Sequence, residues 1–529
     1  MLRKSVQSST IETMDSPQTV VSLLANSRST VHYDGGSITA QQLAVDGVAV
    51  ASALTRLGLV AGDRVAVWAA NGLGYLRLVA AAATGRFILV SVNTRFSIDE
   101  AASVIERSGA RMVVTSPNED LTHRLGSQCK AIDVNKFDSA TSDDLVADGP
   151  VEGQPSNFAQ PDDPFVVFTT SGTTSLPKLV LHTQRSIHNH AHDVAQLFGY
   201  TPNTRTLVAL PLCGVFGLAS LAAPLAGHST VWLPSQFDAE TAAAEIERHQ
   251  ISIMHGPDDM FHRMMATSHD LSSINLAGYA RFNPSLGDIV ERASLRGITL
   301  TGLYGMSEVQ ALFMLQDPTG PEDERALGGG LVVSADAKAR VVDPNTGLAQ
   351  PVGEPGELQL YGPSMFAGYL QPGGDGIDLE LTESAFATDA DGTRWFCTGD
   401  LACHEANGTI TYLTRMGDVL RLGGFLVSPA EIEEVLVGHR DIAEAQVVTV
   451  AQPQGVRPVA IVIANQDGQS KSRLDEDDVI SYCAARLAKF KVPIKVLAVD
   501  EYPVALSANG TKIQRNVLQT WATEATQSS

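Results

Sequence analysis

The chain has 529 residues, of which 44% are hydrophobic and 18% charged, a composition typical of a globular enzyme that excludes a largely disordered protein. With 37 basic against 59 acidic side chains, the formal net charge of −22 disfavours binding to nucleic acid and to acidic membranes. The first 20 residues contain no continuous apolar segment, and the five cysteines form no CxxC pair. We expect a multidomain, reduced, cytoplasmic protein.

The first predicted elements lie between Arg64 and about Val114, where apolar runs alternate with segments of helical periodicity. The runs RVAVWAA, FILVSV and RMVVTS are expected to be strands, and Gly74 to Ala83 and Ile98 to Ser108 are expected to be helices. This alternation predicts a wound α/β unit with a parallel sheet.

The segment Val167 to His182, VFTTSGTTSLPKLVLH, joins a buried strand end to a hydroxyl-rich turn and then to Lys178. The turn residues are Thr170, Ser171, Gly172, Thr173 and Thr174. Their backbone N–H groups and hydroxyls can wrap an anion, and the lysine adds a compact cation, so the segment predicts phosphate binding. The alternative is an ordinary Ser/Thr/Gly turn. The spacing differs from the GxxxxGK[ST] phosphate loop, whose fold is therefore not implied.

Residues Thr206 to Phe237 contain no Asp, Glu, Lys or Arg, and the apolar run within them is long enough to cross a bilayer. Proline and glycine residues divide the run into an expected strand end, a loop and a helix, and no basic cluster flanks it. We therefore expect an interior segment and no membrane span.

The α/β alternation returns after the turn, with LVALPL, STVWLP, ISIMHG and ITLTGLYG as expected strands and Ala239 to His249 as a helix. Beyond Gly328, the segments KARVVDPNTG, GELQLYG and GTITYLTR predict a small β subdomain. Near Gly417 the pattern changes again: VSPAEIEEVLVGH predicts a helix, QVVTVA and PVAIVIA predict strands, and residues 467–478 predict an exposed polar loop. We expect a large N-terminal domain, residues 1–417, and a small mobile α+β domain, residues 418–529.

Five further motifs follow in a fixed order. They are YGMSE (Tyr304 to Glu308), GELQLYGPSMFAGY (Gly356 to Tyr369), WFCTGD (Trp395 to Asp400), RMGDVLRLGGFLVSPAEIE (Arg415 to Glu433) and NGTKIQR (Asn509 to Arg515). Together they resemble the adenylate-forming enzymes, the superfamily of acyl-CoA synthetases, peptide-synthetase adenylation domains and beetle luciferases. The resemblance covers about Arg64 to Leu518 and is greatest to acyl-CoA ligases.

The resemblance implies an ATP site in the N-terminal domain. The hydroxyl-rich turn and Lys178 would hold the outgoing pyrophosphate. Tyr304 would stack on adenine, Gly305 and Ser307 would line the phosphate and carboxylate site, and Glu308 would hold Mg²⁺, a hard cation that prefers oxygen ligands.

The WFCTGD motif would bind the ribose. Asp400 would accept both ribose hydroxyls, with Gly399 before it allowing a close approach of the backbone. Arg415 would add a second contact to ribose or phosphate.

The resemblance also implies a hinge at Asp418, about which the small domain rotates between two half-reactions. In one orientation Lys512 would bridge the attacking carboxylate and the α-phosphate, which makes it the strongest catalytic candidate. In the other orientation Gly423 and Gly424 would face the site during thioester formation.

The sequence departs from the family pattern at several positions. Gly214 stands where relatives often have a bulky residue, and together with Phe216 it is expected to line the acyl pocket. Arg281, Phe282 and Asn283 replace a run of small residues along adenine and substrate. Arg421, in place of a lysine, keeps the charge but not the geometry, since a planar fork differs from a point charge. Further replacements are Ser175, Leu179 and Thr511.

The implied reaction joins a small carboxylic acid to coenzyme A: ATP converts the acid to an acyl adenylate with release of pyrophosphate, and the CoA thiol then displaces AMP. The alternative keeps the first step and passes the acyl group to a carrier-protein thiol or to a partner enzyme. A regulatory relative without turnover is disfavoured because four candidate functional residues are all present. These are Lys178, Glu308, Asp400 and Lys512.

Overall fold

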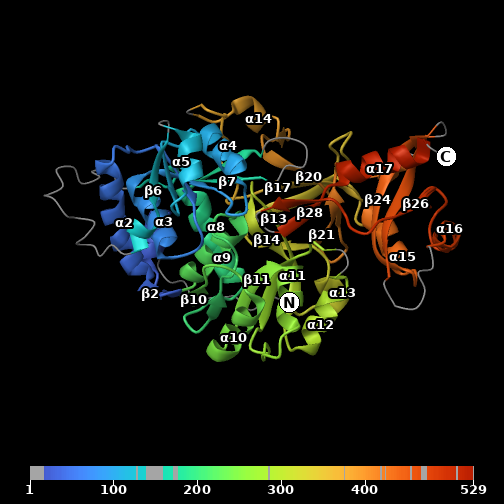
Figure 1. Cartoon of the computed structure of the whole chain (residues 1–529), viewed down its shortest axis with the longest axis horizontal. Helices are drawn as coiled ribbons and strands as arrows, with labels where there is room; N and C mark the ends of the chain where they lie inside the picture. Colours follow the sequence, from blue (N-terminus) through green and yellow to red (C-terminus); the bar gives the residue numbers. More distant parts are fainter. Residues whose placement is uncertain are drawn as a thin grey trace.

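The computed structural model describes residues 17–126, 129–138, 159–170, 177–283, 286–374, 376–417, 420–422, 425–452, 455–465, 474–507 and 510–527. Figure 1 shows a large body and, at its right side, a smaller orange and red lobe that includes α15 (Pro429–Val437) and α17 (Arg515–Gln527). The molecule is therefore mixed α/β with a large N-terminal part and a small C-terminal part, as the sequence predicts.

A first sheet has seven strands. In spatial order they are β18 (Gly368–Tyr369), β8 (Leu179–Thr183), β7 (Pro164–Thr169), β4 (Ile88–Ser91), β3 (Arg64–Trp68), β5 (Met112–Thr115) and β6 (Lys130–Asp133). The strands from β7 to β6 pair in parallel, which confirms the predicted wound unit. The strand β4 is buried along its whole length, as expected for a parallel sheet covered on both faces.

The first sheet is accompanied by α2 (Ala40–Arg56), α3 (Leu73–Gly85), α4 (Ile98–Ser108), α5 (Glu119–Leu125) and α6 (Asn135–Asp138). The boundaries of α4 follow from local chemistry. Ser97 and Glu100 form a reciprocal capping box at its start, and Gly109, with a φ of 66°, ends it in the left-handed conformation.

A second, 14-stranded sheet joins the second α/β unit to the predicted β subdomain without interruption. Its order is β16 (Lys338–Val342), β17 (Gly356–Tyr361), β20 (Arg394–His404), β21 (Ile410–Arg415), β15 (Gly329–Val332), β14 (Gln310–Leu315), β13 (Leu300–Met306), β12 (Leu276–Ala280), β11 (Ile253–Pro257), β9 (Arg205–Leu207), β10 (Thr230–Leu233), β1 (Thr30–Tyr33) and β2 (Gly36–Thr39), with β19 (Phe386–Thr388) paired to β20. Pairing is parallel from β13 to β1 and antiparallel from β13 to β16.

The helices associated with this part are α1 (Val20–Asn26), α8 (Gln184–Leu197), α9 (Val215–Ala226), α10 (Ala239–His249), α11 (Asp258–Met265), α12 (Ile289–Leu295), α13 (Glu322–Arg325) and α14 (Leu379–Glu383). Helices α8 and α9 pack against each other and against β14. This packing connects the first sheet to the second, because α8 directly follows β8.

The C-terminal part contains β22 (Leu420–Leu422), β23 (Phe425–Val427), α15, β24 (Ile442–Gln452), β25 (Gly455–Ala464), α16 (Glu476–Ala484), β26 (Val496–Ala498), β27 (Val504–Ser507), β28 (Gly510–Ile513) and α17. Strands β24, β25 and β26 form one sheet, and β27 and β28 form a separate hairpin. The predicted hinge residue Asp418 is outside the described residues, so the boundary at 417/418 stays a prediction.

Two sequence expectations about local structure were wrong. Strand β9 ends at Leu207, whereas LVALPL was expected to be a strand, because the Asn71 side chain bonds the Leu210 carbonyl and the Leu212 amide in place of a neighbouring strand. Part of the expected loop 467–478 is helical, because the Asp475 carboxylate caps α16.

The apolar run between Thr206 and Phe237 forms the end of β9, the buried helix α9 and β10, as predicted. Within the described part of the chain, no helix has both the length and the hydropathy needed to cross a bilayer.

Candidate active site

The two ends of the hydroxyl-rich turn are held together by backbone and side-chain bonds. The Thr170 amide donates to the Lys178 carbonyl at 3.0 Å, and the Lys178 amide donates to Thr170 Oγ1 at 3.1 Å. The turn therefore leaves and re-enters the sheet at neighbouring positions of β7 and β8. The predicted ligands Ser171, Gly172, Thr173 and Thr174 are outside the described residues.

Lys178 and Glu308 meet across the ring of Tyr369. The Lys178 ammonium lies 4.5 Å from the ring centroid, and the Tyr369 hydroxyl donates to Glu308 Oε1 at 2.9 Å. Burial raises the pKa of Glu308, although the hydrogen bond from Tyr369 and the charges of Arg415 and Lys178 act in the opposite direction. A buried, partly compensated carboxylate next to a lysine is the arrangement expected of a cation and phosphate site.

The YGMSE motif lies where β13 turns into β14, in a backbone with little room. A Cβ atom on Gly305 would lie 2.6 Å from the Ala311 Cα, so only glycine fits at this approach of the two strands. Gln310 and Leu312 have φ values of 67° and 65°, which are strained for residues with side chains. This strained hairpin fixes the positions of Ser307 and Glu308 between the two strands.

The buried His182 also holds this turn in place. Burial lowers the pKa of His182 to about 4, so the ring is neutral near pH 7. Its Nε2 lies 2.7 Å from the Ser307 carbonyl oxygen, to which a neutral ring donates its proton. His182 therefore links the end of β8, four residues beyond Lys178, to the motif that carries Glu308.

Tyr304, Asp400 and Arg415 form a second group on β13, β20 and β21. The Tyr304 hydroxyl donates to Asp400 Oδ2 at 2.5 Å, and Arg415 Nε lies 3.1 Å from Asp400 Oδ1. Asp400 is 2% exposed and Tyr304 is 7% exposed, so this carboxylate is buried between a phenol and a guanidinium. The contact brings together three residues that the sequence assigns to adenine and ribose recognition.

Gly399 was expected to allow a close approach of the backbone to the ribose. No protein atom lies within 4 Å of a Cβ built on this residue, so packing within the chain does not require glycine here, and the expected approach to ribose stays a prediction. Its φ of 67° places it in the left-handed region, which favours glycine.

The predicted residues of the C-terminal domain are only partly described. Lys512 lies on β28, opposite Ala505 of β27 in the hairpin register. Asp418, Gly423 and Gly424 are outside the described residues. Their roles therefore stay predictions.

The predicted acyl-pocket residues lie at the start of α9. Gly214 is the N-cap of this helix, and Phe216 is 3% exposed in its first turn. Because α9 packs against β14, these residues belong to the same region of the fold as the YGMSE hairpin.

The unusual segment at Arg281, Phe282 and Asn283 has its own support. The buried Asp258 carboxylate accepts the backbone amides of Phe282 and Asn283 at 2.9 and 2.8 Å. A carboxylate that fixes the backbone in this way can substitute for the tight packing that a run of small residues would give. The Arg281 side chain points to the C-terminal part and lies 3.6 Å from Glu434 of α15.

The Arg281–Glu434 pair gives a prediction about the two parts of the molecule. Because both side chains are partly exposed, at 34% and 65%, breaking the pair is expected to cost only about 0.2–1 kcal/mol. Arg281→Glu should therefore change the steady-state rate less than about fivefold, and the exchanged pair Arg281→Glu/Glu434→Arg should restore it. A double-mutant cycle at Arg281 and Glu434 measures their coupling free energy, and Arg440→Glu serves as the control variant. Strict additivity of the two single variants would contradict a direct interaction.

The sequence analysis missed two residues that organise the site. Tyr369 is the last residue of the GELQLYGPSMFAGY motif, and its place in that motif was a usable signal. His182 is likewise the last residue of the quoted segment VFTTSGTTSLPKLVLH, but a lone histidine at a strand end is more often a core residue, so its role was not predicted. The centroid of the Tyr412 ring lies 5.7 Å from that of Tyr304, so Tyr412 adds another aromatic side chain beside the predicted adenine site.

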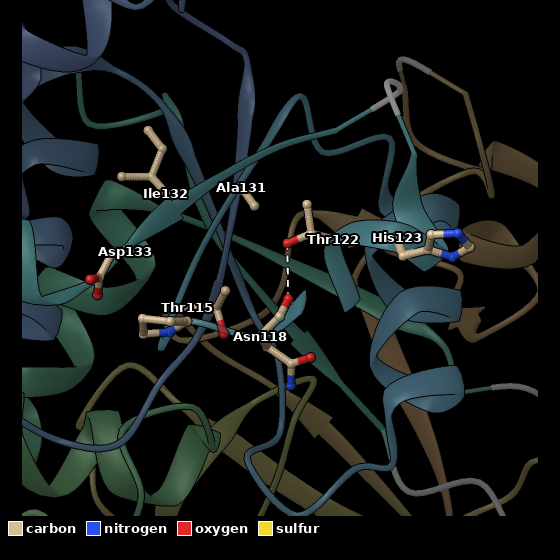
Figure 2. Close-up of a pocket in the computed structure, with 8 residues that line it drawn as sticks. Thr115, Asn118, Thr122, His123, Ala131, Ile132 and Asp133 are labelled. Atoms are coloured by element: carbon tan, nitrogen blue, oxygen red, sulfur yellow. Dashed lines mark hydrogen bonds between the residues drawn. The ribbon is translucent and has the colours of Figure 1, made fainter. Parts of the chain in front are cut away.

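A hollow of about 470 Å³ lies away from these residues, at the carboxyl ends of β5 and β6. Figure 2 shows Thr115, Asn118 and Asp133 on its sides, with the Thr122 hydroxyl bonded to the Asn118 carbonyl. None of the predicted site residues lines it, so we do not assign the reaction to this hollow.

Two protein-family models and several known proteins match most of this chain. A family model described as "AMP-binding enzyme" matches residues 23–370, and one described as "AMP-binding enzyme C-terminal domain" matches residues 431–510. The 2-succinylbenzoate–CoA ligase of Bacillus licheniformis is 29% identical, over 88% of this chain and 92% of that protein. A feruloyl-CoA synthase of Amycolatopsis sp. is 28% identical, over 89% of this chain and 92% of that protein.

The fold has a close structural counterpart. The ATP-bound structure of MatB from Rhodopseudomonas palustris superimposes with a TM-score of 0.81, covering 96% of this chain and all of that one at 23% identity. Since the first family model spans more than half of the sequence, the chain belongs to the AMP-binding enzyme family.

Proposed function

We propose that this protein is an AMP-forming acid–thiol ligase. It converts a carboxylic acid and ATP to an acyl adenylate and pyrophosphate, and then transfers the acyl group to the thiol of coenzyme A. The observation that carries the proposal is the contact network of Lys178, Tyr369 and Glu308. It joins a lysine, a phenol and a buried carboxylate from three separate motifs.

The chemistry of the first step explains these residue types. As the acid attacks the α-phosphorus, negative charge spreads over phosphate oxygens and must be met by donors already in position. Lys178 and the hydroxyl-rich turn stabilise the outgoing pyrophosphate, and Lys512 stabilises the charge at the α-phosphate. Both cations therefore act more strongly on the transition state than on bound ATP.

Mg²⁺ fits the donor set at Glu308. This carboxylate is 5% exposed and its charge is disfavoured by burial, so a divalent cation would compensate it directly. Tyr369 orients the carboxylate by donating to Oε1. When bound with ATP, the ion would neutralise phosphate charge.

Asp400 is the proposed ribose ligand. A carboxylate has about four acceptor positions, so the bonds to Tyr304 and Arg415 leave capacity for ribose hydroxyls. The same two bonds fix the carboxylate plane before ATP binds, which lowers the entropy cost of recognition.

Two of the relatives are named for acids that carry an aromatic ring, 2-succinylbenzoate and ferulate. We propose an acid of comparable size for this chain, since Gly214 leaves space where a larger side chain would fill the pocket. All five cysteines are free thiols, which fits a reducing, cytoplasmic location where ATP and coenzyme A are available.

A two-stage assay tests the proposal. Purified protein is offered ATP, Mg²⁺ and a panel of short, long, aromatic and polycyclic acids, including 2-succinylbenzoate and ferulate. We expect acid-dependent pyrophosphate release, and a thioester only when coenzyme A is added. Adenylation without a thioester would instead favour a carrier-protein acceptor, and no ATP cleavage with any acid would refute the proposal.

A further inference from the structure

Helix α8 carries two histidines one turn apart that have no part in the proposed reaction. His188 is half-buried and His192 is exposed. Residues four apart lie on the same face of a helix, and the two ring centroids are 4.3 Å apart with an interplanar angle of 33°. Two imidazoles are therefore held next to each other at a surface that solvent reaches.

Hydrogen bonds fix the protonation pattern of both rings. His192 Nδ1 lies 2.9 Å from the carbonyl oxygen of His188, which can only accept, so this nitrogen carries the proton. His188 Nδ1 lies 3.1 Å from Asn189 Oδ1 and donates to it in the same way. Each neutral ring therefore has its lone pair on Nε2, and a Nδ1–H held by an oxygen is the usual support of a metal-binding histidine.

We propose that Nε2 of His188 and Nε2 of His192 together bind one divalent late first-row metal ion, Cu²⁺, Ni²⁺ or Zn²⁺, with water as the remaining ligands. Neutral imidazole is a preferred ligand of these ions, and histidines at i and i+4 of a helix can chelate one ion. By the general order of affinities, Cu²⁺ binds most tightly of the three.

Other side chains near the proposed site supply negative charge, but the ion would have only two protein ligands. The carboxylates of Asp193 and Asp336 interact electrostatically, and Asp193 also interacts with His192, which places negative charge near the ion. Burial lowers the pKa of His228, and the charges of Arg28 and His192 lower it further. Its Nδ1 accepts the Arg28 amide, however, so its proton lies on Nε2 and it supplies no further ligand as placed.

A rival cluster in the C-terminal part is less suitable. Among the described residues, only His439, Asp441 and Asp478 form a group of three with ligand atoms close together. His439 Nδ1 accepts the Asp441 amide at 3.3 Å, so the proton is on Nε2, which faces Asp478 at 3.4 Å. This histidine is a hydrogen-bond donor to a carboxylate and has no lone pair for a metal.

His269 is excluded for a similar reason. Its two ring nitrogens lie 2.7 and 3.1 Å from Glu247 and Glu240. The hydrogen bond to Glu247 raises the pKa of His269, which favours the doubly protonated ring.

A metal ion at this position would clamp the turn of α8 that packs toward the active site. His190, between the two ligands in sequence, is buried, and its Nε2 lies 2.6 Å from the Ala311 carbonyl of β14. Because the ion would bind only the folded helix, it should raise the melting temperature.

The test uses the full chain without an affinity tag, after removal of metal with EDTA. Calorimetric titration with Cu²⁺ should give one ion per chain, and the electron paramagnetic resonance spectrum should show coupling to two imidazole nitrogens. His192→Ala should weaken binding by at least about tenfold, whereas His123→Ala, at an exposed histidine on α5, should titrate like the wild type.

Further variants keep the outcome clear. Since His192 is exposed, its replacement should leave the EDTA-treated melting temperature unchanged, so the test does not depend on His188→Ala folding. Asn189→Ala removes the acceptor for His188 Nδ1 and should weaken Cu²⁺ binding less than either histidine variant. Binding that is absent in the wild type, or equal in wild type and His192→Ala, would overturn the proposal.

Discussion

Lys512→Ala is expected to lower the rate of acyl-adenylate formation by about 10²–10³-fold, the usual effect of removing one preorganised charge from a transition state. Thioester formation from a supplied acyl adenylate and coenzyme A should be nearly unchanged. The reason is the chemistry of the two steps: charge develops on the α-phosphate oxygens as the acid attacks, and the second step begins after pyrophosphate has left. Pyrophosphate release and thioester formation, measured separately, check both halves.

Two controls give this prediction its specificity. Lys489→Ala removes an exposed lysine from the same C-terminal part and should leave both half-reactions intact. Lys512→Arg keeps the positive charge but replaces a compact ammonium with a planar fork, so partial adenylation is expected. Equal loss of both half-reactions in Lys512→Ala would contradict the assigned role. Because Lys512 lies at the hairpin position opposite Ala505, a melting curve should accompany each assay.

The order of motifs predicted that Tyr304, Asp400 and Arg415 belong to one nucleotide site, and the structure brings these three side chains into contact. Lys178 precedes β8, Glu308 follows β13, and Asp400 lies on β20. The α/β alternation likewise predicted the parallel core, since short buried strands and periodic helices have distinct patterns.

The links between the motifs were not predictable from local pattern. Tyr369 joins Lys178 to Glu308 only because β18 adds to the edge of the first sheet beside β8, a pairing between residues nearly two hundred positions apart. The support of Phe282 and Asn283 by Asp258 is similar, because a buried aspartate at a helix start has no distinctive spacing. Such contacts depend on tertiary packing, which periodicity does not encode.

The structure also differs from the sequence prediction where the second α/β unit meets the β subdomain, again because strand pairing depends on tertiary packing. The sequence predicts two units because the texture changes near Gly328, yet β13, β14 and β15 continue one sheet across the change. The strained positions Gln310 and Leu312 lie in this junction. The backbone is therefore strained next to Glu308, where a functional role can justify the cost in stability.

Glu308→Gln is expected to lower adenylation by about 10²-fold or more and also to stabilise the fold at pH 7. Glutamine keeps an oxygen that accepts the Tyr369 hydroxyl but loses the charge proposed to hold Mg²⁺. Weaker binding of Mg²⁺-dependent ATP, measured by calorimetry, should accompany the loss of rate. Glu354→Gln, at an exposed carboxylate, is the control and should change neither quantity.

The pH dependence of this stabilisation follows from the raised pKa of Glu308. An unfolded glutamate titrates near pH 4.3, so above that value the unfolded chain releases a proton that the folded chain still holds. The folded state therefore loses stability relative to the variant as the pH rises from about 4.3 toward the higher folded pKa. Melting temperatures of wild type and Glu308→Gln should be similar at pH 4 and diverge by pH 7, with the variant higher. If Glu308→Gln were instead less stable than the wild type at pH 7, the charge of Glu308 would be compensated within the fold itself. The carboxylate would then be retained for a structural reason.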